Sequence, residues 1–259
     1  MKVLVSNPCL HPQSIYLPYF WARLKTYIDL DYEKELSVDW LEPLFFHDPV
    51  LPNEPFDVLA LSCYVWNYEK QYELAKKAKK INPNVFVIAG GPQVPMHDNN
   101  IFEQAPIDAI CITEGERIFS ELLYAIEHNY DIDIPGIILK TNANKKRDIV
   151  PKLELQHLSS PWLHCATEME NFAKRIHEDG KRVNVMFETN RGCPYKCAFC
   201  DWGMATNSKI KRFSHDMLID EIDVIMSWSP DFIFVADANY GIFKEDLLYM
   251  QKFAQLKQM

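Results

Sequence analysis

Short apolar runs alternate with amphipathic stretches over the first 139 residues of the chain. The runs are apolar on both faces, which is typical of strands buried inside a parallel sheet. The stretches at 67–81 and 115–129 carry apolar residues at helical spacing. This alternation predicts an α/β fold with a doubly wound, Rossmann-like parallel sheet. The expected strands lie in KVLVSN, FDVLALSCYVW, NVFVIAGGPQV, DAICITEGE and PGIILKT.

A polar segment without a steady period separates this region from a second one. The segment leads into a helix that we expect to stop at Gly180. A strand, a loop, a helix capped by Ser214 and a further strand then follow. The predicted organisation is a first domain at 1–140, a linker with its connecting helix at 141–181, and a second α/β domain at 182–259.

Composition excludes some classes of function. The formal net charge is -9, which argues against broad nucleic-acid binding, because a surface that tracks phosphates needs clustered Lys and Arg. No run reaches the roughly 18 apolar residues of a membrane span. The start of the chain lacks the apolar core of a signal peptide. We therefore expect a cytoplasmic protein with reduced thiols and no membrane partner.

The stretch NRGCPYKCAFCDWG holds Cys193, Cys197 and Cys200, in a chain with seven cysteines. Three soft thiolates this close favour an iron–sulfur cluster or zinc. Structural zinc is usually closed by four ligands, often as two cysteine pairs, and no second pair occurs here. Three ligands leave a metal position open, as in a reactive site.

The spacing C-x3-C-x2-C, with an aromatic residue before the last cysteine, resembles the radical S-adenosylmethionine (SAM) superfamily. The resemblance implies a 4Fe-4S cluster whose open iron chelates SAM, and an electron that cleaves SAM to a 5′-deoxyadenosyl radical. It places Phe199 beside the adenine of SAM, although a plain core aromatic is the alternative. It also places Asp237 and Asn239 on the amino and ribose groups of SAM, although they could simply end a buried strand.

The order of IAGGPQVP, ITEGE, PGIIL, SSPWL and ADANYGIF is similar to radical SAM proteins with an N-terminal cobalamin (B12)-binding domain. This resemblance implies a corrinoid at the carboxyl ends of the first domain's strands. In the other interpretation, the glycine pair only makes a tight turn and Glu116 only favours the helix dipole. The implied cobalamin contacts are Ser62, Trp66, Gly90, Gly91, Pro92, Glu114, Gly115 and Glu116.

The motif D-x-H-x-x-G, whose histidine ligates cobalt in many cobalamin domains, does not occur in the sequence. His11 lacks both the preceding acid and the following glycine, so we expect cobalamin without a protein histidine on cobalt. In the family this arrangement suits methyl transfer, which also requires an electron donor. Lys209, Lys211 and Arg212 could face the carboxylate of SAM, but we interpret them as a solvated charge run. We interpret Cys9, Cys63, Cys111 and Cys165 as small core residues.

The stretch after Cys193 has room for only about two βα units, because each takes roughly 30 residues or more. The family's partial barrel needs more, so we expect either a C-terminally truncated chain or a second polypeptide that completes the barrel. The sequence thus predicts the start of a radical SAM (β/α) partial barrel and a cobalamin-dependent methyltransferase acting on a small molecule or a peptide. The alternative is a non-catalytic cobalamin- or metal-binding module with a structural zinc or iron cysteine site.

Overall fold

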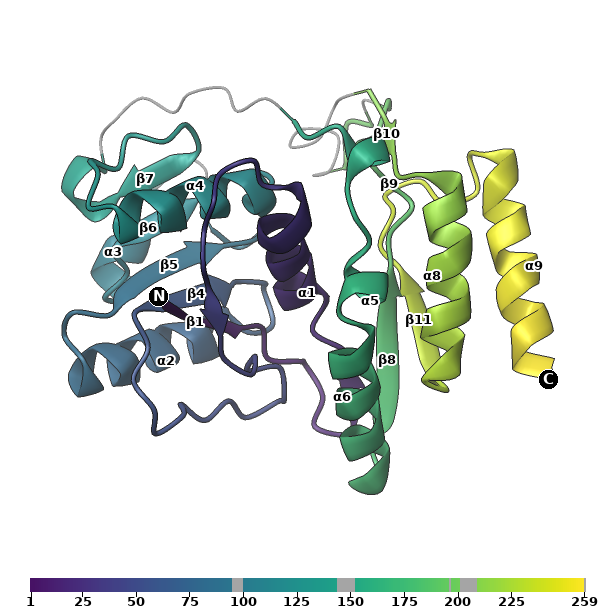
Figure 1. Ribbon diagram of the computed structural model, residues 1–259, viewed down its shortest axis with the longest axis horizontal. Helices are drawn as coiled ribbons and strands as arrows, with labels where there is room; N and C mark the ends of the chain where they lie inside the picture. The colour runs from purple at the N-terminus through teal and green to yellow at the C-terminus, as the bar shows by residue number, and fades with distance from the viewer. Residues whose placement is uncertain (95–99, 144–151, 196, 201–208, 259) are drawn as a thin grey trace. The chain divides into compact units, whose positions relative to one another are not determined.

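The computed structural model describes residues 1–94, 100–143, 152–195, 197–200 and 209–258 (Figure 1). The chain divides into two compact units, Met1–Leu153 and Glu154–Met259. Part of the segment that the sequence assigns to a linker therefore belongs to the second unit. None of the described helices combines the length and the apolar character needed to cross a membrane.

The first unit is built on a six-stranded sheet with the order β3-β1-β4-β5-β6-β7. Its pairings from β3 to β6 are parallel, as the apolar runs predict. A short strand, β2 (Ser14–Tyr16), lies outside this sheet. The six strands are β1 (Lys2–Ser6), β3 (Asp39–Trp40), β4 (Val58–Ser62), β5 (Phe86–Gly90), β6 (Ala109–Cys111) and β7 (Ile137–Leu139).

The edge strand β7 differs from the expectation because it pairs antiparallel with β6. After the helix that follows β6, residues 130–136 return to the carboxyl end of β6 before the chain enters β7. Gly136 turns the chain there with φ of 92°, and its carbonyl accepts a hydrogen bond from the N–H of Ile112 at 2.9 Å. The sheet is therefore mixed at one edge, as is common for doubly wound folds.

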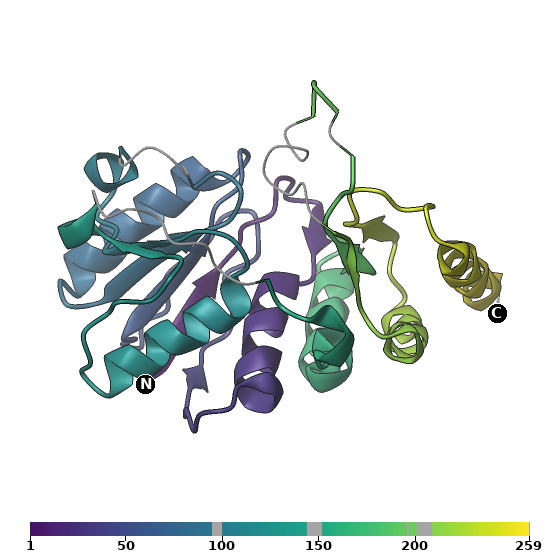
Figure 2. The ribbon, with the colours of Figure 1, turned by 90° about the horizontal axis from the view of Figure 1, so that it is seen from above.

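Helices cover both faces of this sheet. Helices α1 and α4 pack against each other, and Figure 2 shows α2 and α4 on opposite faces. Helices α2 and α4 match the predicted ranges, whereas α1 and its π-helical extension η1 were not predicted. The helical segments are α1 (Tyr19–Thr26), η1 (Tyr27–Asp31), α2 (Tyr68–Ile81), α3 (Ile101–Gln104), α4 (Gly115–Glu127) and the 3-10 turn η2 (Lys140–Asn142).

The second unit contains two βα units. Strands β8 and β11 pair in parallel, with Asn184 opposite Phe232 and Phe187 opposite Val235. Helix α8 connects them, and α9, which follows β11, packs beside α8 (Figure 1). The elements are η3 (Leu155–His157), α5 (Pro161–His164), α6 (Ala166–Glu178), β8 (Arg182–Phe187), β9 (Asn190–Arg191), β10 (Lys211–Arg212), α8 (His215–Ser227), β11 (Phe232–Val235) and α9 (Lys244–Gln258).

Aromatic side chains form much of the core of the second unit. Trp162 and Trp228 meet edge to face with ring centroids 5.7 Å apart. Phe187 at the end of β8 packs in the same way on Phe253 of α9, at 5.2 Å. Ser214 caps α8 as predicted, because its hydroxyl accepts a hydrogen bond from the N–H of Met217. The Phe187 contact packs β8 against α9, and β8 leads directly into the cysteine loop.

Candidate functional site

The two ends of the cysteine loop are joined at its base. Strand β9 precedes the loop and pairs antiparallel with β10, which follows it. Arg191 lies opposite Lys211, and Asn190 lies opposite Arg212. The N–H of Phe213 also donates to the carbonyl of Thr189 at 3.0 Å. The loop therefore starts and ends at one point beside the carboxyl end of β8.

The three loop cysteines differ in burial. Cys193 is buried, Cys197 is exposed and Cys200 is half-buried. The N–H of Cys200 donates to the carbonyl of Cys197 at 3.1 Å, which makes a local turn. Within the ranges that the structure describes, no three or more His, Cys, Asp or Glu side chains come together as a metal site. The predicted triad is thus placed on one loop, without a ligating arrangement of its thiols.

Phe199 is 92% exposed. The interpretation of this residue as a plain core aromatic is therefore wrong. Its contact with SAM stays a prediction, since an exposed ring beside two cysteines is accessible to a ligand.

Asp237 follows β11 and accepts hydrogen bonds from the segment just before the loop. One oxygen, Oδ1, accepts from the N–H of Thr189 at 2.8 Å and of Asn190 at 3.2 Å. The other, Oδ2, accepts from the Thr189 hydroxyl and from the side-chain amide of Asn190. Burial raises the pKa of Asp237 to about 6, against the opposing effect of these hydrogen bonds. The carboxylate thus joins the ends of β8 and β11.

Asn239 lies two residues further on and also contacts the start of the loop. Its side-chain amide donates to the carbonyl of Gly192 at 3.3 Å. The side-chain oxygens of Asn190 and Asn239 are buried and have no hydrogen-bond partner among the described residues. Two buried acceptors beside the cysteine loop are therefore unsatisfied within the described part of the chain. Local sequence does not reveal Thr189 and Asn190, because their partner is 47 or 48 positions away.

The basic residues after the loop are mostly engaged in ion pairs. Lys211 pairs with Glu154 at 2.7 Å. Arg212 pairs with Glu245 at 3.2 Å and lies 4.2 Å from the centroid of the Phe243 ring. The predicted solvated charge run therefore describes Lys209, which is exposed, but not Lys211 or Arg212.

The cysteines outside the loop are buried, as expected for core residues. Burial raises the pKa of Cys9 to about 11 and that of Cys63 and Cys111 to about 12. Cys165 is fully buried beside α6. Thiols that stay protonated are poor ligands for iron, because the thiolate is the form that binds metal.

In the first unit, the predicted cobalamin contacts follow three neighbouring strands. Ser62 ends β4 and lies opposite Gly90 at the end of β5. Gly91 has φ of 101°, and a Cβ on it would lie 2.6 Å from the carbonyl oxygen of Cys63. The close approach at Gly91 is therefore to the backbone after β4. This supports the tight-turn interpretation, while a contact of Gly91 with cobalamin stays a prediction.

The remaining predicted contacts lie at the same strand ends. Trp66 is 45% exposed and stacks on Tyr64, with centroids 4.5 Å apart. Glu114 precedes α4, and its carboxylate accepts from the N–H of Leu153 at 2.8 Å. Pro92 is exposed, whereas Gly115 and the buried Glu116 form the first turn of α4. Trp66 and Pro92 are thus the members of this set that present most surface.

A buried amide network supports these strand ends. The amide of Gln71 in α2 donates to the carbonyls of Ser6 and Ser62 at 2.7 and 3.0 Å. Asn67 donates to the Ser62 carbonyl as well, at 3.1 Å. The network lies where β1 has β3 on one side and β4 on the other, which is the switch point of the sheet. Ligands of doubly wound folds bind at such a point.

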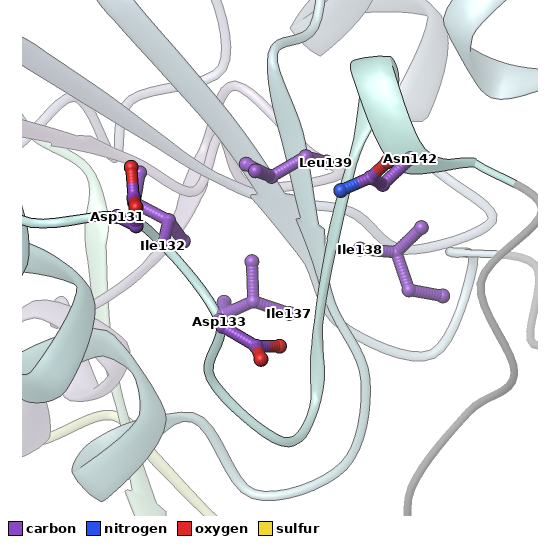
Figure 3. Close-up of a pocket in the computed structure, with 7 residues that line it drawn as sticks. All are labelled: Asp131, Ile132, Asp133, Ile137, Ile138, Leu139 and Asn142. Atoms are coloured by element: carbon purple, nitrogen blue, oxygen red, sulfur yellow. The ribbon is translucent and has the colours of Figure 1, made fainter.

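A depression of about 340 Å³ lies elsewhere in the first unit, over the edge strand β7 (Figure 3). Asp131, Asp133 and Asn142 supply its polar groups, and Ile137 and Leu139 supply apolar walls. It contains none of the predicted site residues.

Known proteins are similar to this chain over most of its length. Residues 51–123 match the B12 binding domain family. The cobalamin-dependent radical SAM methyltransferase TokK of Streptomyces tokunonensis is 38% identical over 244 residues, covering 90% of this chain and 35% of TokK. The 2-(S-pantetheinyl)-carbapenam-3-carboxylate methyltransferase of Streptantibioticus cattleyicolor is 34% identical, with the same coverage. The chain therefore spans about a third of the length of these relatives.

Solved structures agree on the fold. The cobalamin-dependent SAM radical enzyme OxsB with aqua-cobalamin bound superposes with a TM-score of 0.69 at 17% identity, covering 98% of this chain and 37% of OxsB. The radical SAM methyltransferase TsrM of Kitasatospora setae, with tryptophan and a SAM analogue bound, gives 0.67 at 16% identity, covering 99% of this chain and 51% of TsrM.

A doubly wound unit with a B12-domain match, followed by βα units that carry a three-cysteine loop, defines a cobalamin-type radical SAM architecture. Over about 90% of its length the chain is similar to proteins of this kind, which confirms the resemblance seen in its sequence.

Proposed function

We propose that this chain contributes the cofactor-binding part of a cobalamin-dependent radical SAM methyltransferase. The observation that carries the proposal is the position of the three cysteines, directly after β8 at the first βα unit of the second unit. Catalytic groups of α/β barrels gather at the carboxyl ends of strands. Two relatives above 30% identity are methyltransferases by name. We place the protein in the cytoplasm, where thiols stay reduced.

In this proposal, Cys193, Cys197 and Cys200 hold a 4Fe-4S cluster that has one iron without a protein ligand. Their donor set fits such a group, because thiolates are the ligands of iron–sulfur clusters. The free acceptor oxygens of Asn190 and Asn239 fit hydrogen bonds from the ammonium group of SAM. The accessible ring of Phe199 fits the adenine. Asp237, whose oxygens are engaged within the protein, fits a direct contact with SAM less well than Asn239 does.

The first unit would hold cobalamin at the carboxyl ends of its strands. Leu10, Val65 and Trp66 are exposed apolar side chains that follow β1 and β4, next to the switch point. They fit one face of a corrin ring, since Trp supplies a large apolar contact area. When bound, the cluster supplies the electron that cleaves SAM, and methylcobalamin supplies the methyl group.

The reaction requires an external electron donor and a substrate, which we take to be a small molecule because one relative is named for a carbapenam carboxylate. A second polypeptide that completes the barrel stays a prediction of the strand count.

The cysteine assignment is tested by reconstituting the protein with iron and sulfide without oxygen. We expect about four irons with matching acid-labile sulfide in the wild type and loss of the cluster in Cys197→Ala, because two thiolates cannot hold it. Cys9→Ala, outside the loop, should retain the cluster. Zinc in place of iron, or full iron in Cys197→Ala, would favour the non-catalytic module with a structural cysteine site.

The cobalamin assignment is tested separately with hydroxocobalamin and the full chain. Trp66→Ala should weaken retention by about tenfold, the effect of losing one well-buried aromatic contact. Ile81→Ala removes an exposed apolar side chain at the far end of α2 and should have no effect. Equal retention by the two variants would remove Trp66 from the site.

A further inference from the structure

We propose that Asp237 is a positioning residue, which holds the backbone before Cys193 against the end of β11 and so fixes the base of the cysteine loop. The inference rests on the proposed function only in assigning that loop to the cluster. It differs from the role implied by family resemblance, in which Asp237 would contact SAM itself.

The hydrogen bonds of Asp237 carry the first step. A carboxylate offers about four acceptor positions, and Asp237 uses its two oxygens for four donors, all from Thr189 and Asn190. The two backbone donors lie at 2.8 and 3.2 Å. A new donor from a ligand would have to displace one of them. The acceptor positions of the Asp237 carboxylate are therefore occupied by donors of the protein itself.

The second step is the position of the residues that Asp237 holds. Asn190 begins β9, whose pairing with β10 joins the start and the end of the loop. The carbonyl of Thr189 receives the N–H of Phe213, which lies just after β10. Asn239 adds a bond to the carbonyl of Gly192, the residue before Cys193. The end of β11 thus contacts the chain at three residues among the four that precede Cys193.

The third step is energetic. Ordering a loop costs backbone entropy at every residue that is fixed. A loop whose ends are already fixed loses less entropy when its thiols bind metal. Groups that orient metal ligands from outside the coordination sphere commonly change metal affinity by about 10- to 100-fold when mutated. Removing the Asp237 contacts should therefore weaken cluster retention.

The same strand pair provides a matched control. Asp231, before β11, accepts a hydrogen bond from the N–H of Val183 at 2.8 Å, at the opposite end of β8 and β11. Asp231→Asn and Asp237→Asn therefore change carboxylates at opposite ends of the same two strands, and Asp231 also lies 3.4 Å from Nε2 of His177. Only the second is next to the cysteine loop.

Two readouts on the full chain test the proposal. The first is amide hydrogen exchange in the iron-free protein. We expect Asp237→Asn to accelerate exchange at Asn190, Arg191 and Arg212 by about tenfold relative to Asp231→Asn, since opening of the base becomes easier. The second is iron release from the reconstituted protein to a chelator, which should be about tenfold faster in Asp237→Asn. Asn190→Ala should behave like Asp237→Asn in both.

The outcomes separate this inference from the proposed function. Unchanged exchange in Asp237→Asn relative to Asp231→Asn would overturn it, as would weaker SAM binding with iron release unchanged, because that pattern belongs to a direct SAM contact. Absence of a four-iron cluster in the wild type would overturn the proposed function, while the exchange result would still decide the role of Asp237.

Discussion

At the residue scale, Gly91 and Cys63 explain why a glycine pair ends β5. The backbone of Gly91 has a positive φ, and its α-carbon faces the backbone of Cys63. Gly90 has ordinary space, with a built Cβ 3.6 Å from the Cβ of Cys111. Only one glycine of the pair is therefore required by the fold. Gly91 is needed for the strand end, whether or not a ligand lies beside it.

Gly91→Ala should destabilise the first unit by about 3 kcal/mol, from backbone strain and steric overlap together. Gly180→Ala is the control, because its φ of 67° is also positive but nothing lies within 4 Å of the added Cβ. It should cost about 1 kcal/mol, from strain alone. Urea unfolding followed by fluorescence measures both. Equal losses of unfolding free energy in the two variants would show that the backbone at Cys63 shifts to accommodate the added Cβ.

Asp237 also predicts a pH dependence of stability. Its folded-state pKa is raised to about 6 by burial, so its contribution to stability is complete below about pH 4 and is lost as the pH rises through about 6. The free energy of unfolding of the wild type, relative to Asp237→Asn, should fall by about 2 kcal/mol between pH 4 and 7. Urea unfolding at the two pH values checks this. A difference that grows with pH would contradict the raised pKa.

Local sequence indicated the three candidate cysteine ligands but not the residues that support their loop. The three cysteines lie within eight residues of each other in the chain, so their spacing alone indicates a metal site. Thr189 and Asn190 contact Asp237 only after β8 and β11 pair. The hydrophobic periodicity of a short stretch carries no information about a contact between residues so far apart in sequence. Gln71 was missed for the same reason, since its partners are 9 and 65 positions away.

At the element scale, burial patterns predicted most strands and two helices of the first unit. Strand β7 shows the limit of such patterns. The apolar pattern of β7 is equally compatible with parallel and antiparallel pairing. The pairing is antiparallel because residues 130–136 return to the carboxyl end of β6. Helix α1 was missed because its eight residues include Trp, Phe and Thr, which have modest helix propensity, and no side chain caps it.

Helix α5 has only four residues and depends on one serine. The Ser160 hydroxyl accepts from the N–H of Leu163 at 3.1 Å and donates to Glu221 of α8 at 2.6 Å. Ser160→Ala should cost about 2 kcal/mol, since it removes a cap and a buried partner of a carboxylate. Ser214→Ala removes a cap alone and should cost about 1 kcal/mol. Urea unfolding detected through Trp162 and Trp228 compares them, and equal costs would refute the added role of Glu221.

At the scale of the whole molecule, two sheets of parallel strands each present a different set of chemical groups at their carboxyl ends. The first unit presents apolar and backbone groups around Ser62, and its family match covers β4 to β6. The second presents thiols and amides around Cys193. The class of protein could be predicted from sequence because the cysteine spacing and the order of the short motifs resemble a known family. The antiparallel pairing of β7 and the contacts of Asp237 with Thr189 and Asn190 could be seen only in the folded chain.

We propose that the cysteine loop holds a cluster with an iron open to SAM. The most direct test is electron paramagnetic resonance of the reduced, reconstituted protein before and after adding SAM. We expect a four-iron signal whose g-values change when SAM is added, because SAM would become a ligand of the open iron. A cluster signal that SAM leaves unchanged, at SAM concentrations far above those of the protein, would contradict it.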